Sequence, residues 1–139
     1  MSAKTASGLL MHLVRNQSRV TKRLDQYLSA QGISLSEYQV LDALAAAPGQ
    51  QLRRIDLAET VGLSASGVTR LLNPMEKIGL VRKELSPRDA RVSLVALTEA
   101  GSRTLQDSQS RVAQCADPVF QSLDTHQRGP LPKLIPHLR

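Results

Sequence analysis

Residues 54–79 read RIDLAETVGLSASGVTRLLNPMEKIG, and this stretch decides the fold. Its first part, residues 54–61, has the spacing of a short helix. The residues expected on the inner side of that helix are Ile55, Leu57, Ala58 and Val61. Gly62 tolerates the left-handed backbone at which many helices end, and Ser64 can cap the helix that follows until Gly79. Helix, short turn containing glycine, helix is the pattern of a helix-turn-helix.

The second helix of this pair begins with small and polar residues. In a helix-turn-helix, this helix lies in the major groove of DNA with its N-terminal residues at the base edges. Such a surface needs close approach, hydroxyl groups and a guanidinium donor. An ordinary solvent-exposed helix face is the alternative. The inward-facing residues should be Val68, Leu71, Leu72 and Met75. The candidate DNA-binding residues on this helix are Ser64, Ser66, Thr69 and Arg70.

Two short strands are expected after this helix. Residues 80–85 (LVRKEL) and 91–97 (RVSLVAL) have strand-like composition, and residues 86–90 (SPRDA) would join them as a hairpin. A hairpin attached to a helix-turn-helix is a wing. Thr98 then follows as the expected cap of a last long helix.

The tip of this hairpin is charged. Pro87 prevents regular strand pairing, and Asp89 can turn the chain or order an arginine. Arg88 and Arg91 are therefore expected to project outward. Arginine at a wing tip suits a narrow minor groove, where the negative potential of DNA is concentrated. The alternative is a hairpin tip that is merely solvated.

Other basic residues around this region are weaker candidates for contacting DNA. They could contact phosphates, although a solvated surface is the favoured interpretation for each of them. They are Arg53, Arg54, Lys77, Arg82 and Lys83.

Helices are expected before this region. An apolar stripe predicts a long amphipathic helix that ends near Gly32. Its members are Leu9, Leu10, Leu13, Val14, Val20, Leu24, Tyr27 and Leu28. Ser34 and Glu37 then have the spacing of a capping box, which predicts a second helix to about Ala46, stopped by Pro48 and Gly49.

Composition favours a polyanionic partner. The 139-residue chain has 18 Lys and Arg against 12 Asp and Glu, a net charge of +6, and its isoelectric point is about 10.1. A basic balance of this kind is typical of proteins that bind nucleic acid. With two Tyr, one Phe and no Trp, the chain lacks the aromatic platforms on which single strands stack. Double-stranded DNA is therefore the favoured partner.

Several other classes of protein are disfavoured. A single cysteine, Cys115, excludes an internal disulfide and fits a reducing compartment. No apolar run approaches the roughly 18 residues of a membrane span, so we expect a cytoplasmic protein with no membrane partner. The sequence has no phosphate-binding glycine loop, no metal-binding pattern and no histidine placed to activate Cys115 or a serine. We expect no enzyme activity, no cofactor and no metal site.

The run LSASGVTRLLNPMEKIGLVRK followed by SPRDARVSLVALTEAG resembles the MarR family of dimeric winged-helix transcriptional regulators. The family pattern, Asp-x-Arg in the wing leading into Leu-Thr-x-x-Gly, is matched by Asp89, Arg91, Leu97, Thr98 and Gly101. The resemblance covers residues 9 to about 123 in element order. It implies a homodimer built from the first and last helices. Ser66, Thr69 and Arg70 would lie near bases, Arg91 would reach the minor groove and Asp89 would steady the wing.

The resemblance also implies repression of transcription and release by a small ligand. Family members commonly bind a phenolic or anionic compound between the dimer helices and the DNA-binding lobe. His12 and Arg15, on the first helix, are the candidate residues for such an effector. A histidine that simply lies on the helix surface or in an interface is the alternative for His12.

We therefore predict a mainly α protein with a small β-hairpin wing, a winged helix-turn-helix flanked by N- and C-terminal dimerisation helices. Residues 1–33 form the N-terminal dimerisation helix, 34–98 the DNA-binding region, and 99–139 the C-terminal dimerisation helices and an irregular tail. The expected function is that of a sequence-specific double-stranded-DNA-binding regulator, a homodimeric repressor. A winged helix used for protein docking is the alternative, although docking would favour apolar residues where this chain has Ser, Thr and Arg.

Three local features leave alternatives open. Pro74 either bends the second helix slightly or breaks it, because proline lacks the backbone donor of a helix interior. In the tail, Gly129 and three prolines disfavour a long helix, so its apolar residues either dock as a short helical or irregular segment or fray. Cys115 is expected as a small buried residue, with an oxidation sensor as the alternative.

Overall fold

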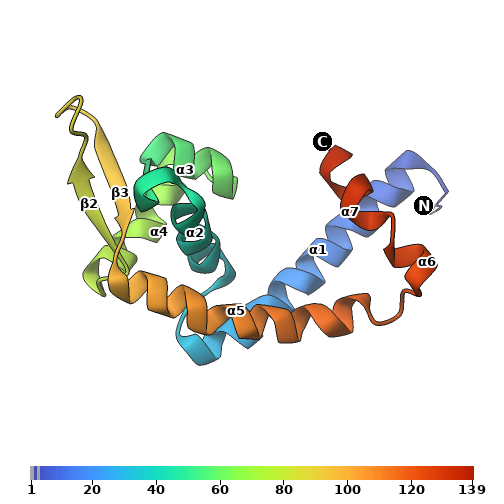
Figure 1. Cartoon of the computed structure of the whole chain (residues 1–139). Helices are drawn as coiled ribbons and strands as arrows, with labels where there is room; N and C mark the ends of the chain where they lie inside the picture. Colours follow the sequence, from blue (N-terminus) through green and yellow to red (C-terminus); the bar gives the residue numbers. More distant parts are fainter. Residues whose placement is uncertain (1, 3) are drawn as a thin grey trace.

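The computed structural model describes residue 2 and residues 4–139. Long helices join the winged lobe to the region that contains both chain ends (Figure 1). Figure 1 shows the winged lobe at the left, α5 along the base, α1 rising from beside α5 toward the right, and both chain ends at the right. The helices are α1 (Ala6–Leu28), α2 (Leu35–Ala46), α3 (Arg54–Val61), α4 (Ala65–Lys77), α5 (Glu99–Phe120), α6 (Thr125–Arg128) and α7 (Leu131–Leu134). The strands are β1 (Gln51–Arg53), β2 (Val81–Leu85) and β3 (Ser93–Leu97). The mainly α architecture with a winged helix-turn-helix is confirmed.

The small sheet is antiparallel, with β3 between β1 and β2. Val95 at its centre pairs with Leu52 of β1 on one side and with Lys83 of β2 on the other. The hairpin was predicted, but β1 was not. Three residues are too few to show the alternation by which a strand is recognised.

The second strand of the hairpin begins later than predicted. Arg91 and Val92 belong to the turn, and β3 starts at Ser93. Hydrogen bonds inside the turn account for the difference. The Asp89 carboxylate accepts from the backbone N–H of Arg91. The backbone N–H of Val92 donates to the carbonyl oxygen of Asp89, and the carbonyl oxygen of Val92 accepts from the N–H of Ser86. These bonds make a longer, ordered tip between the two strands.

The core lies where α2, α3, α4 and the sheet meet the end of α1. Fully buried side chains from these elements include Leu28, Leu41, Leu44, Leu57, Leu72, Met75 and Val95. Ile55 was predicted to join them and does not, since it is 67% exposed. At 3.6 residues per turn, Ile55 is rotated about 160° from Leu57, so it points away from the core that Leu57 enters.

The predicted helix starts are confirmed. Ser34 and Glu37 make both bonds of a capping box at the start of α2, and Thr98 caps α5 by accepting from the N–H of Gly101. Of the two alternatives for Pro74, the structure has the continuous helix, because α4 runs through it to Lys77. Pro74 lies in the C-terminal part of α4, after the candidate DNA-binding residues Ser64 to Arg70.

The tail forms short helical segments, α6, α7 and a 3-10 turn at Ile135–His137. Its apolar residues remain largely uncovered: Leu134, Ile135 and Leu138 are each more than half exposed. Cys115 is buried, as expected for a small core residue. Among the helices of residues 2 and 4–139, none has the length and apolarity needed to cross a membrane.

Candidate nucleic-acid interface

The first turn of α4 is held by its own capping residue. The Ser64 hydroxyl accepts from the N–H of Gly67 at 3.1 Å, and it lies 3.2 Å from the hydroxyl of Ser66. Both serines are exposed. Ser64 therefore orders the helix start as a cap, and Ser66 is the more available of the two hydroxyls for an outside partner.

Arg70 lies on the outer face of the same helix, one position after Thr69. Its side chain is exposed, while Val68 and Leu72 on either side are 1% and 0% exposed and anchor the helix in the core. This arrangement fixes the backbone of Arg70 and leaves its guanidinium in solvent. The inward face predicted for α4 is confirmed, with Leu71 partly buried against the core.

Arg54 does not lie free on the surface. It reaches from α3 to α4, where its guanidinium contacts Glu76 Oε1 at 3.1 Å and Thr69 Oγ1 at 3.5 Å. Its side chain is only 25% exposed. For Arg54, the sequence predicted either a phosphate contact or a solvated surface. Its pairing with Glu76 was not predicted, because no local spacing connects positions 22 residues apart.

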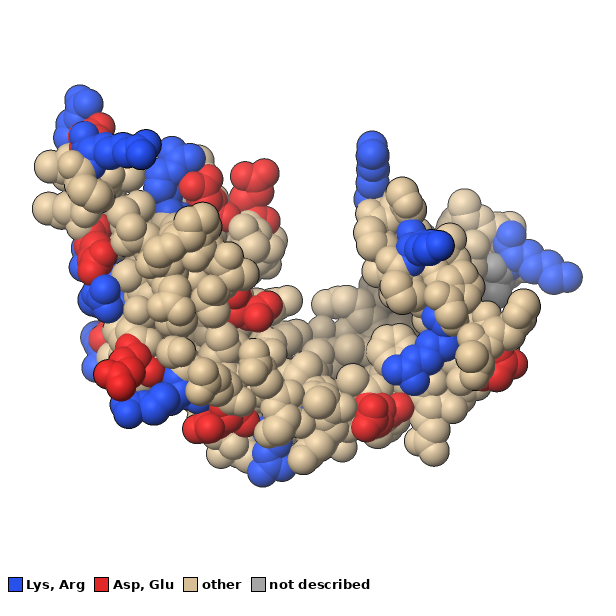
Figure 2. All heavy atoms as spheres, in the orientation of Figure 1, with Lys and Arg blue, Asp and Glu red and all other residues tan. Residues whose placement is uncertain are grey.

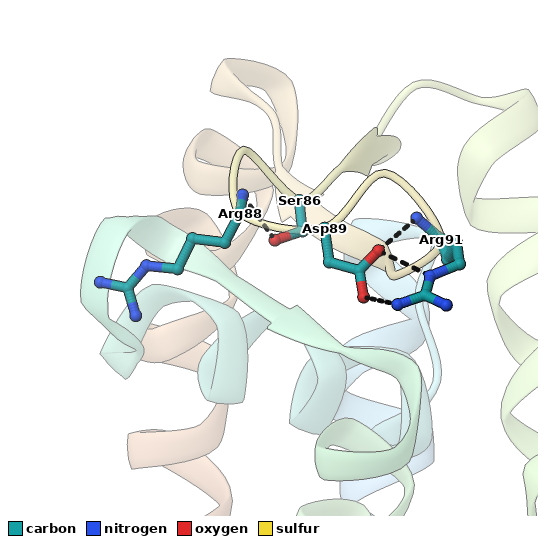
Figure 3. A network of polar contacts seen from close by, with 4 residues as sticks. All are labelled: Ser86, Arg88, Asp89 and Arg91. Atoms are coloured by element: carbon teal, nitrogen blue, oxygen red, sulfur yellow. Dashed lines mark hydrogen bonds and ion pairs between the residues drawn. The ribbon is translucent and has the colours of Figure 1, made fainter.

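The wing tip is organised by Asp89 (Figure 3). Its carboxylate accepts from the backbone N–H, the Nε and the Nη2 of Arg91, at 3.0, 3.1 and 3.2 Å. These bonds hold the pKa of the Asp89 carboxyl below its usual value. The Arg91 side chain is nevertheless 91% exposed, so it is oriented and still accessible. Arg88 extends in another direction (Figure 3), and its backbone N–H donates to Ser86 Oγ.

Charges of both signs surround these residues. Figure 2 shows Lys and Arg at the wing tip and along the outer edge of the same lobe, with Asp and Glu between them. Some of the basic residues have acidic partners, as in the Arg53–Asp56 and Arg82–Glu84 ion pairs. Arg91 is also paired, with Asp89, but its side chain is 91% exposed, against 55% for both Arg53 and Arg82. Arg91, Arg88 and Arg70 are therefore the stronger candidates for contacting an anion.

The wing is joined closely to α5. The Thr98 hydroxyl lies within hydrogen-bond distance of the backbone carbonyl oxygens of both Gly79 and Leu80, which share its one hydrogen. A Cβ atom at Gly101 would clash with the carbonyl oxygen of Leu80 and with the side chain of Leu97. The Leu-Thr-x-x-Gly sequence thus lets the first turn of α5 contact the start of the wing, which fixes the wing relative to the long helix.

The N-terminal half of α1 exposes apolar side chains. Leu9, Leu10, Leu13 and Val14 are between 47% and 56% exposed. His12 and Arg15 lie on the same exposed segment. Neither residue lines the groove of about 440 Å³ that α1 forms with the end of α5. The basic residues that line that groove are Arg19 and Arg23, and its apolar lining includes Val20 and Phe120.

Comparisons with known proteins agree on one family. The model of the MarR family matches residues 31–92. The HTH-type transcriptional regulator PrsX of Escherichia coli is 30% identical over 99 residues, which are 70% of this chain and 60% of PrsX. The transcriptional repressor MprA of Escherichia coli strain K12 is 25% identical over 91% of this chain and 70% of MprA. The chain thus spans about 60% of the length of PrsX.

A solved structure extends the likeness to the whole fold. Sco3205, a MarR family transcriptional regulator from Streptomyces coelicolor crystallised in complex with DNA, superposes with a TM-score of 0.84. The match has 24% identity and covers 98% of this chain and 86% of that one. This likeness extends over the helix-turn-helix, the wing and the flanking helices of this chain and shows their common fold. The family model and the curated relatives show that this chain belongs to the MarR family.

Proposed function

We propose that this protein is a sequence-specific regulator of transcription that binds double-stranded DNA. The observation that carries the proposal is the pairing, on one lobe, of an exposed polar helix start with an ordered, exposed arginine at the wing tip. Ser66, Thr69 and Arg70 would face base edges in the major groove, with Ser64 at the start of the helix. Arg91, steadied by Asp89, would enter the adjacent minor groove, and Arg88 would assist it.

The working form in this proposal is a homodimer. The uncovered apolar residues of α1 and of the tail support it, because apolar groups gathered on one part of a surface favour association. Residues 1–33 and 99–139 would dimerise, and residues 34–98 would bind DNA. Two copies of α4 would then address a pseudo-palindrome whose half-sites lie roughly 34–36 Å apart, one turn of the duplex. Bound there, the dimer would act as a repressor.

An effector is part of the same proposal. The groove between α1 and α5 is lined by Arg19 and Arg23 together with apolar side chains. This chemistry suits a small aromatic or anionic compound, whose charge the arginines would bind. It supports an effector near the first helix, where His12 and Arg15 remain candidates on the exposed segment next to the groove.

The test is selection of duplexes from a randomised double-stranded library by the full-length protein, followed by affinity measurements at several salt concentrations. We expect an enriched pseudo-palindrome and a fall of log affinity with log salt of about 0.9 per phosphate neutralised. Light scattering should give the mass of a dimer. A stable monomer that enriches no sequence and binds heparin as well as any duplex would contradict the proposal and favour the docking module.

A further inference from the structure

The hydroxyl group of Thr69 is already engaged within the protein. It donates to the backbone carbonyl oxygen of Ala65, one turn back on α4, at 3.1 Å. The guanidinium of Arg54 approaches the same hydroxyl oxygen from α3, at 3.5 Å. A hydroxyl has a single hydrogen to donate. While it is bonded to Ala65, the Thr69 hydroxyl therefore has no hydrogen to offer a base edge, although this residue faces outward.

Arg54 is itself held on that side of Thr69. Another nitrogen of its guanidinium donates to Glu76 Oε1 at 3.1 Å. The Arg54 and Glu76 side chains are 25% and 28% exposed, so the pair is partly shielded from water between α3 and α4. Turning the Thr69 hydroxyl toward a groove would break its bonds to both Ala65 and Arg54. The side chain is thus favoured in the orientation that leaves its methyl group for an outside contact.

The surroundings of Thr69 are also mainly apolar. Thr69 lines a hollow between α3 and α4 whose other residues are the apolar Ile55, Ala58, Leu63 and Ala65 and the charged Arg54 and Glu59. Ile55 and Leu63 are 67% and 38% exposed, so apolar side chains face solvent beside the first turn of α4. Among the base edges of the major groove, thymine presents a methyl group, and apolar groups, including the threonine methyl, contact it.

We propose that Thr69 recognises a thymine in each half-site through its methyl group, and that Arg54, held by Glu76, is the positioning residue for this contact. The inference rests on the proposed function, in which the N-terminal part of α4 enters the major groove. At one position of each half-site, Thr69 contacts the C5-methyl group of thymine rather than a hydrogen-bonding edge.

Deoxyuridine provides the test, because it pairs as thymidine does and lacks the C5-methyl group. The duplex that the full-length protein selects from a randomised library is resynthesised with each half-site thymine replaced in turn. We expect replacement at one position of a half-site to weaken binding about fourfold, the effect of losing one buried methyl-sized group. Replacement at the other thymines should have a smaller effect.

Two variants of Thr69 separate its methyl from its hydroxyl group. Thr69→Ser keeps the hydroxyl and removes the methyl, so the penalty for uracil should disappear. Thr69→Val keeps the methyl group and replaces the hydroxyl by a second methyl, so the penalty for uracil should remain about fourfold. Thermal unfolding confirms that both variants are folded. The reverse pattern, with the penalty kept by Thr69→Ser and lost by Thr69→Val, overturns the inference, because the hydroxyl would then be the reading group.

Arg54→Gln tests the positioning role. The penalty for uracil should fall, while the slope of log affinity against log salt stays at the wild-type value, since Arg54 neutralises no phosphate in this arrangement. A shallower slope with an unchanged penalty would make Arg54 a phosphate contact and would overturn its positioning role.

The test also separates this inference from the proposed function. A wild-type protein that selects no duplex overturns both. A wild-type protein that selects a duplex in which every thymine tolerates uracil overturns only the reading by Thr69.

Discussion

Asp89 binds both the backbone and the side chain of Arg91, two positions further along the wing tip. The carboxylate therefore has two effects. It closes the turn between β2 and β3, and it gives direction to a guanidinium that is otherwise surrounded by solvent. The Asp-x-Arg part of the family pattern has a structural explanation here, because the spacing of two allows one carboxylate to reach the N–H and the Nε of the same arginine.

The first prediction concerns the pKa of Asp89. The bonds from Arg91 lower it, so they stabilise the folded wing above the ordinary aspartate pKa, and this stabilisation is lost as the pH falls through the lower pKa of the folded state. Arg91→Ala should raise the pKa of Asp89 toward its ordinary value, measured by NMR titration of the carboxyl carbon. Arg88→Ala is the matched control and should leave it low. An equal pKa in both variants would show that Arg91 is not the cause.

The second prediction concerns the flanks of the DNA site. Arg91→Ala should weaken binding and reduce any preference for A·T-rich flanks, because a narrow A·T minor groove attracts arginine most strongly. Affinities for two duplexes with the same centre and either A·T or G·C flanks measure this. Arg139→Ala, an equal charge change at the end of the chain, is the control. If Arg91→Ala weakens binding to both duplexes equally, the wing contacts phosphate alone.

Local patterns predicted much of this structure. Ser34, Ser64 and Thr98 cap the helices they were expected to cap, because a cap and its partner lie within three residues. The inward face of α4 followed from its period in the same way. The strand boundary at Arg91 was wrong because a side chain, Asp89, competes there with the strand for a backbone donor.

Features that depend on distant residues were missed. The strand β1 exists through its pairing with β3, more than 40 positions later. The partner of Arg54 lies on another helix. Ile55 and Leu57 lie on opposite sides of α3, and the packing of α3 against distant elements decides which of the two is buried. The assignment of Ser66, Thr69 and Arg70 to bases remains a prediction, since their exposure permits contact with DNA without identifying the base.

A third prediction concerns the reading of a base by Arg70. Arg70→Ala should weaken specific binding by about 1–3 kcal/mol and relax the preference at one base position of each half-site. Lys77→Ala, an equal charge change at the exposed end of α4, is the control and should affect all sequences alike. Binding to the selected duplex and to single-base variants of it gives both quantities. An unchanged sequence preference in Arg70→Ala would mean that another residue reads this position.

The fourth prediction concerns the contact between α5 and the wing. Gly101→Ala should destabilise the protein by about 1–3 kcal/mol, because the added Cβ meets the rigid carbonyl of Leu80. Gly67→Ala is the matched control: its added Cβ meets the Ser64 hydroxyl oxygen at 3.2 Å, which a small side-chain shift relieves. The gain of up to about 1 kcal/mol in helix propensity offsets that shift, so we expect a smaller loss than in Gly101→Ala. Urea unfolding at one fixed protein concentration measures both. Equal stabilities would indicate that α5 can shift away from Leu80.

The last prediction compares two ion pairs on neighbouring residues. Arg54 and Glu76 join two helices with side chains 25% and 28% exposed, whereas Arg53 and Asp56 pair within one turn at 55% and 41%. Water screens the second pair more, so a double-mutant cycle should give a coupling of about 1 kcal/mol for the first and near zero for the second. The variants are Arg54→Ala with Glu76→Ala and Arg53→Ala with Asp56→Ala, measured by urea unfolding at one protein concentration. Equal couplings would show that Arg54 contributes no more than a surface charge.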